Sequence, residues 1–313
     1  MSQRHLRRRY FQTMPEVRFV TVSKAESGQK LLQFLERRLT GDVPRSAIQR
    51  WIRKGQVRVD KGRKKPFDRI HEGQVVRIPP YTPGDVKPVE AGGTLVVAYE
   101  DEHILAIAKP AGLAAHGGDK VTDSVAGRLA VMYPDADFRP TLAHRLDRDT
   151  SGLLLVAKDY ETLRQLNDQF ASGGVGKLYL AWVKGQWREQ GEVLLEDRME
   201  KKGTPGQEKV RTGSGKTALA RVKGLVSGPK QSLVAVRLLT GRTHQIRVQL
   251  ASRKHPVLGD RKYGFGNVRG AMRLHCCAMC VDGVTHSLLP PWTGKWAVSE
   301  DVLREALGML FDG

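Results

Sequence analysis

A stretch rich in proline and glycine, residues 81–94, divides the chain into two parts. It lacks the periodic apolar residues that mark helices and strands, and its composition is typical of a linker. The 313 residues are enough for two modest domains, each with a core of its own. We therefore expect a small domain over 17–80 and a larger one over 95–313, preceded by a basic tail over 1–16.

Positive charge is concentrated in the first of these parts. The chain has 52 Lys and Arg against 33 Asp and Glu, a net charge of +19. Residues 1–80 contain 20 of the basic and 7 of the acidic residues, so about a quarter of the chain carries +13 of this excess. Such an imbalance costs self-repulsion unless a polyanion offsets it, and it indicates a nucleic-acid partner.

Composition also bears on the compartment. No apolar run approaches the roughly 18 residues that a membrane-spanning helix needs. The opening MSQRHLRRRYFQTMPE lacks the apolar stretch of a secretory signal, although a mitochondrial presequence would be similarly basic. Cys276, Cys277 and Cys280 are odd in number and clustered, which argues against a disulfide framework. We predict a cytoplasmic protein away from the membrane, with a mitochondrial location as the alternative.

The small domain is predicted to contain two helices followed by two strands. Apolar residues recur at helical spacing over 27–39 and over 44–55, where the second helix begins at Pro44 and ends at Gly55. Its apolar side chains form one stripe, and its basic ones occupy the other faces: Arg45, Arg50, Arg53 and Lys54. These basic residues predict an RNA-binding surface that contacts phosphates and depends on salt. The alternative is a solvated charged face.

In the large domain, charged residues meet the start of an apolar strand in HRLDRDTSGLLLVAK, residues 144–158. Asp147 lies between Arg145 and Arg148, and guanidinium neighbours keep a carboxylate ionised, as a nucleophile or a base requires. Asp149 is expected to cap a turn over 150–152. A structural ion-pair network explains the same residues, and local chemistry alone favours it.

Four segments together resemble the large-subunit (RluA-type) family of pseudouridine synthases. They are HRLDRDTSGLLLVAK, KLYLAWVKG with Tyr179, LLTGRTHQIRVQLASRKHPVLGDRKYG with Arg247, and RLHCCAM, and they occur in the family's order. In the small domain, VPRSAIQRWIRKGQVRVDKGRKKP resembles the S4 RNA-binding domain. The resemblance implies an α+β fold: a small αα-β S4 domain and a catalytic domain with a large mixed, mainly antiparallel sheet. The active cleft is expected where strands bearing Asp147, Tyr179 and Arg247 converge.

The resemblance also implies an activity, the isomerisation of uridines in 23S ribosomal RNA to pseudouridine without a cofactor or metal. Asp147 would be the essential carboxylate beside a flipped-out uridine, attacking the ribose, attacking the base or removing a ribose proton. Arg247 would pair with Asp147, and Tyr179 would stack on the base. RNA contacts are expected from neighbouring residues: Arg145, which would fill the space left by the uridine, His144, Arg242 and His244. The expected partner is protein-free or assembling ribosomal RNA, bound by a monomer.

Three other patterns are set aside. TGSGKTALA lacks the first glycine of a phosphate-binding loop, since position 210 is Val210, and we expect a turn entering a strand. Adjacent cysteines on a strand point to opposite faces, so we expect Cys276 and Cys277 to be buried core residues and not zinc ligands. A hydrolase with two catalytic carboxylates would use Asp149 as the second acid, and the resemblance argues against it.

Overall fold

The structure is a computed structural model that describes residues 16–39, 43–81, 92–117, 123–204, 209–264 and 270–311. The chain separates into two compact units, Met1–Pro88 and Val89–Gly313. Most of the predicted basic tail (1–16) and linker (81–94) lies outside the described residues. Among the helices that are described, none is both long and apolar enough to cross a membrane.

The amino-terminal unit builds one core from two helices and a small sheet. The sheet is antiparallel with the order β1-β3-β2, and the elements are β1 (Arg18–Thr21), the 3-10 helix η1 (Lys24–Glu26), α1 (Leu31–Arg38), α2 (Arg45–Arg53), β2 (Arg58–Val59) and β3 (Val75–Ile78). The apolar stripes of both helices are buried in the core: Leu31, Leu32, Phe34, Leu35, Ile48 and Ile52. Because α2 buries only this stripe, its basic face remains in solvent.

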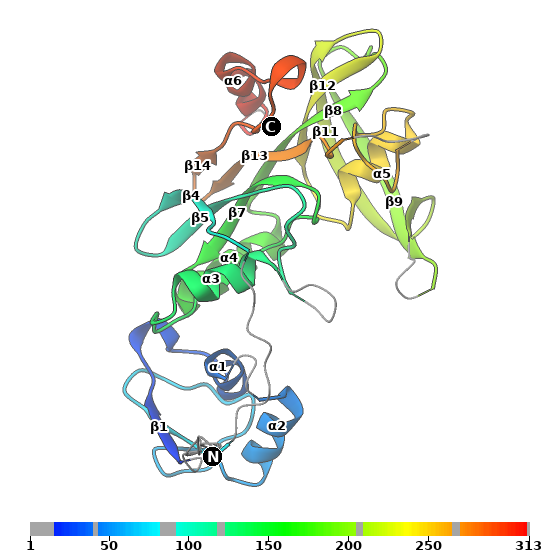
Figure 1. The fold of residues 1–313 in the computed structure, drawn as a ribbon. Helices are drawn as coiled ribbons and strands as arrows, with labels where there is room; N and C mark the ends of the chain where they lie inside the picture. Colours follow the sequence, from blue (N-terminus) through cyan, green and yellow to red (C-terminus); the bar gives the residue numbers. More distant parts are fainter. Residues whose placement is uncertain are drawn as a thin grey trace, which may run out of the picture. The chain divides into compact units, whose positions relative to one another are not determined.

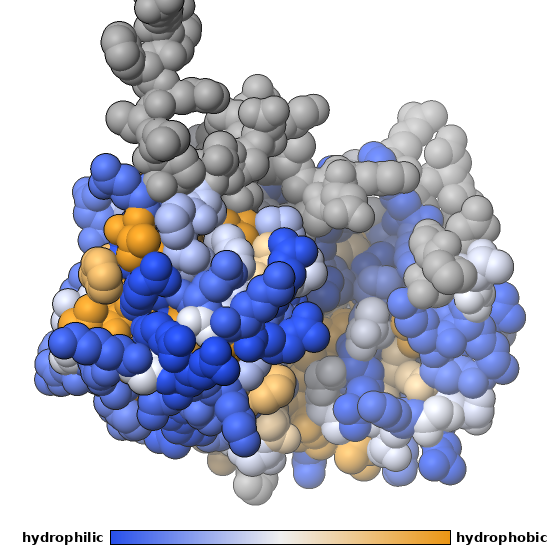
Figure 2. All heavy atoms as spheres, turned by 90° about the horizontal axis from the view of Figure 1, so that it is seen from below, coloured by the Kyte–Doolittle hydropathy of each residue, from blue (hydrophilic) through white to orange (hydrophobic). Residues whose placement is uncertain are grey.

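The end of α2 brings three basic side chains together. Gly55 follows the helix with φ of +66°, the left-handed conformation that glycine adopts at a helix end. A Cβ here would lie 2.6 Å from Nε of Arg63, so the loop after β2 lies against the end of α2. Arg53, Lys54 and Arg63 are exposed, and we call these three residues the basic patch. Hydrophilic residues cover most of the face of this unit seen in Figure 2.

The second unit is organised by one large, mainly antiparallel sheet (Figure 1). Its main path has the order β10-β9-β11-β12-β8-β13-β7-β5-β4, with β14 paired to β13 and β6 to β7. The strands are β4 (Val96–Glu100), β5 (Ile104–Lys109), β6 (Thr141–Leu142), β7 (Ser151–Ala157), β8 (Gly176–Lys184), β9 (Glu192–Lys202), β10 (Lys209–Thr212), β11 (Lys216–Ser227), β12 (Gln231–Leu238), β13 (Leu274–Val281) and β14 (Val284–Ser287). Among the pairs between these strands, only β7 with β13 is parallel.

Helices cover parts of this sheet. They are α3 (Val125–Met132), α4 (Tyr160–Ser172), α5 (Gln245–Ser252), the 3-10 helix η2 (Gly294–Trp296) and α6 (Glu300–Gly308). In Figure 1, α4 lies along β7, and α5 lies beside β9, which it contacts. The segment TGSGKT is the turn between β10 and β11, as expected. The mixed sheet and the α+β class are confirmed, whereas α3, η2 and α6 were not predicted.

The apolar strand after Asp147 lies at the centre of the sheet. All seven residues of β7 are buried, which explains the unbroken apolar run. Gly152 has φ of +121°, and a Cβ on it would lie 2.3 Å from the carbonyl oxygen of Cys276, so only glycine allows β13 to lie this close. The prediction of a turn over 150–152 is wrong, because Ser151 and Gly152 already belong to β7. The turn lies over 147–150, where the N–H of Thr150 donates to the carbonyl of Asp147 (3.1 Å).

Candidate functional site

The loop that carries Asp147 is fastened to the segment after β5. The Lys109 ammonium donates its three hydrogen bonds to carbonyl oxygens of Pro110 (2.9 Å), Leu113 (2.7 Å) and Arg148 (3.0 Å). Gly112 N–H also donates to the Arg148 carbonyl (2.8 Å), and Nε of Arg148 donates to the Gly112 carbonyl (3.0 Å). Arg148, which the sequence suggested only as a charged neighbour of Asp147, therefore joins the two loops.

Lys109 is a buried cation that the sequence analysis missed. Its side chain is almost wholly inaccessible to solvent. Burial lowers its pKa to about 8, and the nearby charges of Asp149 and Asp147 oppose that shift. A lone lysine at the end of the apolar run ILAIA, directly before Pro110, was the available signal.

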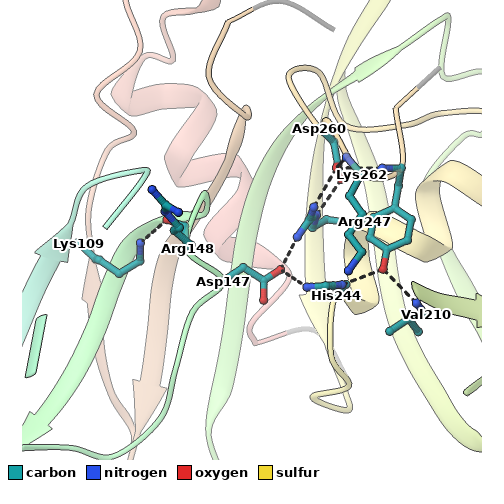
Figure 3. Close-up of polar contacts among 9 residues, drawn as sticks. Lys109, Asp147, Arg148, Val210, His244, Arg247, Asp260 and Lys262 are labelled. Atoms are coloured by element: carbon teal, nitrogen blue, oxygen red, sulfur yellow. Dashed lines mark hydrogen bonds and ion pairs between the residues drawn. The ribbon is translucent and has the colours of Figure 1, made fainter. Parts of the chain in front are cut away.

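Asp147 is ion-paired with Arg247, as expected (Figure 3). Nη1 of Arg247 lies 2.8 Å from Oδ2 of Asp147, and the Asp147 side chain remains 24% exposed. On its other edge the guanidinium donates twice to Asp260, from Nε to Oδ2 (2.7 Å) and from Nη2 to Oδ1 (2.9 Å). A bidentate pair fixes the plane of a guanidinium, so Arg247 presents Nη1 to Asp147 in a defined direction.

Asp260 is the second residue that sequence analysis did not single out. Its side chain is fully buried, and it also accepts hydrogen bonds from the N–H groups of Lys262 (2.9 Å) and Tyr263 (3.1 Å). Burial alone would raise the pKa of Asp260, but the hydrogen bonds and charge of Arg247 lower it below its ordinary value. In return, the two carboxylates outweigh the effect of burial and raise the pKa of Arg247. The centre of the site is thus an Asp–Arg–Asp array of ion pairs with one accessible end, Asp147.

His244 lies near the same oxygen of the Asp147 carboxylate as Arg247. Its Nε2 is 3.8 Å from Oδ2 of Asp147, and its Nδ1 is 2.8 Å from the hydroxyl of Tyr263. The residue has φ of +54° and directly precedes α5. The side chain of Gln245 closes this turn by accepting hydrogen bonds from the N–H of Arg242 (2.9 Å) and the hydroxyl of Thr240 (2.8 Å). The sequence HQIR therefore supplies both the turn and two of the site's side chains.

Tyr179 lies inside the sheet, on β8. Burial raises its pKa well above the ordinary value, and a hydrogen bond with Cys276 and the charge of Asp147 act in the same direction. The side chain is therefore a neutral phenol that the charge of Asp147 still affects. The expectation that three strands converge on the cleft is wrong: Asp147 lies in the loop before β7, and Arg247 lies on α5.

Apart from His244, which lies beside Asp147 and is largely buried, the residues predicted to contact RNA fall into two groups. His144 has a structural environment: its Nε2 accepts the N–H of Leu155 (2.9 Å), its ring lies 4.6 Å from that of Phe170, and burial lowers its pKa to about 3. These contacts are all within the protein, whereas a contact with RNA was predicted. The second group is exposed and consists of Arg45, Arg50, Arg53, Lys54, Arg145 and Arg242. Two of these residues also contact the protein: Arg45 pairs with Glu36 (2.9 Å), and Arg242 donates to the Thr217 carbonyl (2.9 Å).

The cysteine cluster lies within and beside the core. Cys276 and Cys277 are wholly buried on β13, where the register with β8 shifts between Cys276 and Ala278. Burial raises the pKa of Cys276 to about 12 and that of Cys277 well above its ordinary value, so neither is an available thiolate at neutral pH. Over the described part of the chain, no three His, Cys, Asp or Glu side chains are grouped to hold a metal ion.

The chain is similar in sequence and in structure to known proteins. Residues 103–252 match the family model for RNA pseudouridylate synthase, and residues 29–76 match the S4 domain. The chain is 38% identical over 260 residues to ribosomal large subunit pseudouridine synthase C of Yersinia pestis, covering 80% of this chain and 81% of that protein. It is 39% identical over 259 residues to the enzyme of the same name from Escherichia coli K12, with the same coverage.

A solved structure is similar as well. Human RNA pseudouridylate synthase domain containing 1 aligns with a TM-score of 0.56 and 25% sequence identity, covering 73% of this chain and 98% of that one. The matched family segment contains Asp147, Tyr179 and Arg247, but ends before Asp260 and Tyr263.

Proposed function

The chain belongs to the RNA pseudouridylate synthase family, and from that premise we propose that it isomerises uridines of 23S ribosomal RNA to pseudouridine with Asp147 as the essential carboxylate. The observation that carries the proposal is the Asp147–Arg247–Asp260 array. It orients a carboxylate while leaving part of that carboxylate accessible. The names of the relatives support large-subunit ribosomal RNA as the substrate.

The reaction sets clear requirements for the site. The bond between N1 of uracil and C1′ of ribose breaks, a bond between C5 and C1′ forms, the proton on C5 is lost and N1 gains one. No redox change or group transfer occurs, so the protein's own side chains can supply what is needed. The uridine must leave the RNA stack, because these atoms are inaccessible within it. Asp147 acts beside the sugar, either as nucleophile toward ribose or base, or by removing a ribose proton.

Other side chains assist in this proposal. Tyr179, kept neutral by burial, offers its ring to the flipped uracil. Arg145 is exposed in the same loop as Asp147 and fills the space that the uridine leaves in the RNA. Arg242 contacts the RNA backbone, whereas the contacts of His144 assign it to holding the loop that carries Asp147.

In this proposal the amino-terminal unit positions the RNA and the second unit carries out the reaction. We assign residues 17–80 to the S4 domain and 95–313 to the catalytic domain, and we propose that the protein acts in the cytoplasm as a monomer on protein-free or assembling ribosomal RNA. The basic patch at the end of α2 supports phosphate contact by the S4 domain, which positions the RNA without reading its sequence.

Charge reversal in the basic patch tests this division. Arg53→Glu is expected to raise KM for ribosomal RNA about tenfold at moderate salt and to leave kcat within about twofold, because each lost phosphate contact weakens binding and its salt dependence together. Steady-state kinetics over a salt series measure both effects. Arg164→Glu, at an exposed position on α4 of the other unit, controls for the same change of two charges. A fall in kcat with unchanged KM would contradict the assignment of α2 to binding.

The activity itself is tested by following the hydrogen that leaves C5 of uridine. With ribosomal RNA carrying tritium at C5 of uridine, the proposal predicts release of tritium to water and recovery of pseudouridine in intact RNA. A hydrolase acting through Asp147 and Asp149 would instead produce free uracil and abasic RNA, which chromatography separates from pseudouridine. Free uracil in place of pseudouridine would overturn the proposed reaction.

A further inference from the structure

A chain of polar contacts runs from a strand of the sheet to the Asp147 carboxylate (Figure 3). The N–H of Val210, on β10, lies 3.2 Å from the hydroxyl oxygen of Tyr263. That hydroxyl lies 2.8 Å from Nδ1 of His244, and Nε2 of the same ring lies 3.8 Å from Oδ2 of Asp147. The four residues come from separate parts of the chain: the loop before β7, strand β10, the turn before α5, and the segment after Asp260.

The direction of the protons follows from the two ends of this chain. A main-chain N–H can only donate, so Val210 occupies one lone pair of the Tyr263 oxygen. A carboxylate can only accept, so a neutral imidazole facing Asp147 avoids lone-pair repulsion only when Nε2 carries its proton. Nδ1 is then bare, and the 2.8 Å contact requires Tyr263 to donate its O–H to it. Every group has a compatible role in one arrangement: Val210 to Tyr263, Tyr263 to His244, His244 toward Asp147.

The surroundings of the imidazole favour its neutral form. Burial lowers the pKa of His244; the carboxylates of Asp147 and Asp260 oppose this, and the cations of Arg247 and Lys262 reinforce it. The net effect is a lower pKa of His244, so the ring is neutral at pH 7 and its single N–H proton lies on either Nδ1 or Nε2. The side chain of Gln245 closes the turn that contains His244 by accepting hydrogen bonds from Thr240 and Arg242. The main chain of His244 is therefore held in place, which fixes where its ring nitrogens lie.

We propose that Tyr263 is a positioning residue, whose hydroxyl keeps His244 in the tautomer protonated at Nε2 and so directs that N–H toward Oδ2 of Asp147. Arg247 contacts the same oxygen at 2.8 Å. The N–H of His244 points toward this oxygen from 3.8 Å, so neither contact uses Oδ1, which is left for the uridine. The role in catalysis rests on the proposed function, whereas the tautomer does not. A histidine in this tautomer donates toward Asp147 and does not remove a proton there.

The tautomer is measured directly by ¹⁵N NMR of the full chain labelled at histidine. The His244 signals are assigned by their loss in His244→Gln. Between pH 7 and 8, Nδ1 of His244 is expected at the shift of an unprotonated nitrogen and Nε2 at that of a protonated one. In Tyr263→Phe, the donor to Nδ1 is lost while the aromatic ring remains, and the two shifts are expected to move toward each other. A wild-type ring protonated at Nδ1 would overturn the inference.

Kinetics on ribosomal RNA then test the consequence. Tyr263→Phe is expected to lower kcat about tenfold with KM within about twofold, because the hydrogen bond that directs the His244 N–H toward the carboxylate is lost while the RNA surface is intact. Tyr99→Phe is the matched control, since it removes the phenol of a β4 residue that donates to Asp101, at the far edge of the sheet. His244→Gln, which can still donate near Asp147, is expected to retain more activity than His244→Leu.

The outcomes separate the two proposals. Wild-type kcat in Tyr263→Phe, or equal losses in His244→Gln and His244→Leu, would overturn the positioning role. If the wild-type protein forms no pseudouridine at all, the proposed function fails, and the NMR shifts still decide whether Tyr263 sets the tautomer.

Discussion

Replacing Asp147 with Asn is expected to lower the rate of pseudouridine formation by about 10³-fold or more, because the amide keeps the shape of the side chain but loses the charge that the reaction uses. The expected fold and RNA affinity are unchanged, since the Asp147 side chain is partly exposed and Arg247 keeps its two bonds to Asp260. Single-turnover assays with saturating enzyme measure the chemical step without interference from product release.

Asp149→Asn is the matched control for this substitution. Asp149 is two residues away, exposed, and of the same chemical type. We expect its loss to change the rate less than about threefold, because the Arg247 guanidinium contacts Asp147. Equal losses in the two variants would contradict a single essential carboxylate and would favour the hydrolase with two carboxylates.

Replacing Asp260 with Asn is expected to reduce the free energy of unfolding by about 3 kcal/mol or more, because it removes the charge of a buried ion pair and leaves the Arg247 cation undercompensated. Activity should fall as well, since Arg247 loses the bidentate contact that aims it at Asp147. Denaturant unfolding followed by circular dichroism measures the stability. Asp301→Asn, at an 86% exposed carboxylate of α6, is expected to change it by less than about 0.5 kcal/mol.

The effect of Asp260→Asn should also depend on pH. Despite the opposing effect of burial, Arg247 lowers the pKa of Asp260 in the folded protein below its unfolded value. A carboxylate of this kind contributes stability above the unfolded pKa, and the contribution is lost as pH falls through the folded pKa. The difference in stability between wild type and variant should therefore be constant near neutrality and shrink at acidic pH. A difference that grows on acidification would contradict the ion pair.

Much of the architecture could be predicted from patterns along the chain. The periodic apolar residues of α1 and α2, and the apolar run of β7, are local signals, and the structure confirms those elements. α3, η2 and α6 were not predicted, although α3 and α6 are as long as α1 and α2. Leu303 and Ala306 of α6 share an apolar cluster with Leu178 of β8, a contact that only the fold reveals. The turn before β7 was misplaced because the need for Gly152 arises from contact with Cys276, more than a hundred residues away.

The site was predicted only in part, and the reason is similar. The pairing of Asp147 with Arg247 came from a resemblance of whole segments, since local charges alone favoured a structural network. Lys109 and Asp260 were missed because an isolated charge reveals nothing of its burial or its partners. His144 was assigned to RNA from its position beside Arg145, but its ring faces Leu155 and Phe170. Neighbours in sequence at a loop commonly point in different directions, and only the fold decides which one faces the substrate.

The most direct test of the central claim is a map of pseudouridines in large-subunit ribosomal RNA from three strains. These carry the native gene, a deletion, and the deletion complemented with Asp147→Asn. The predicted result is a set of uridines modified only in the first strain, with normal levels of the variant protein in the third. Restoration of those pseudouridines by Asp147→Asn, or their persistence in the deletion, would contradict the claim that this protein makes them through Asp147.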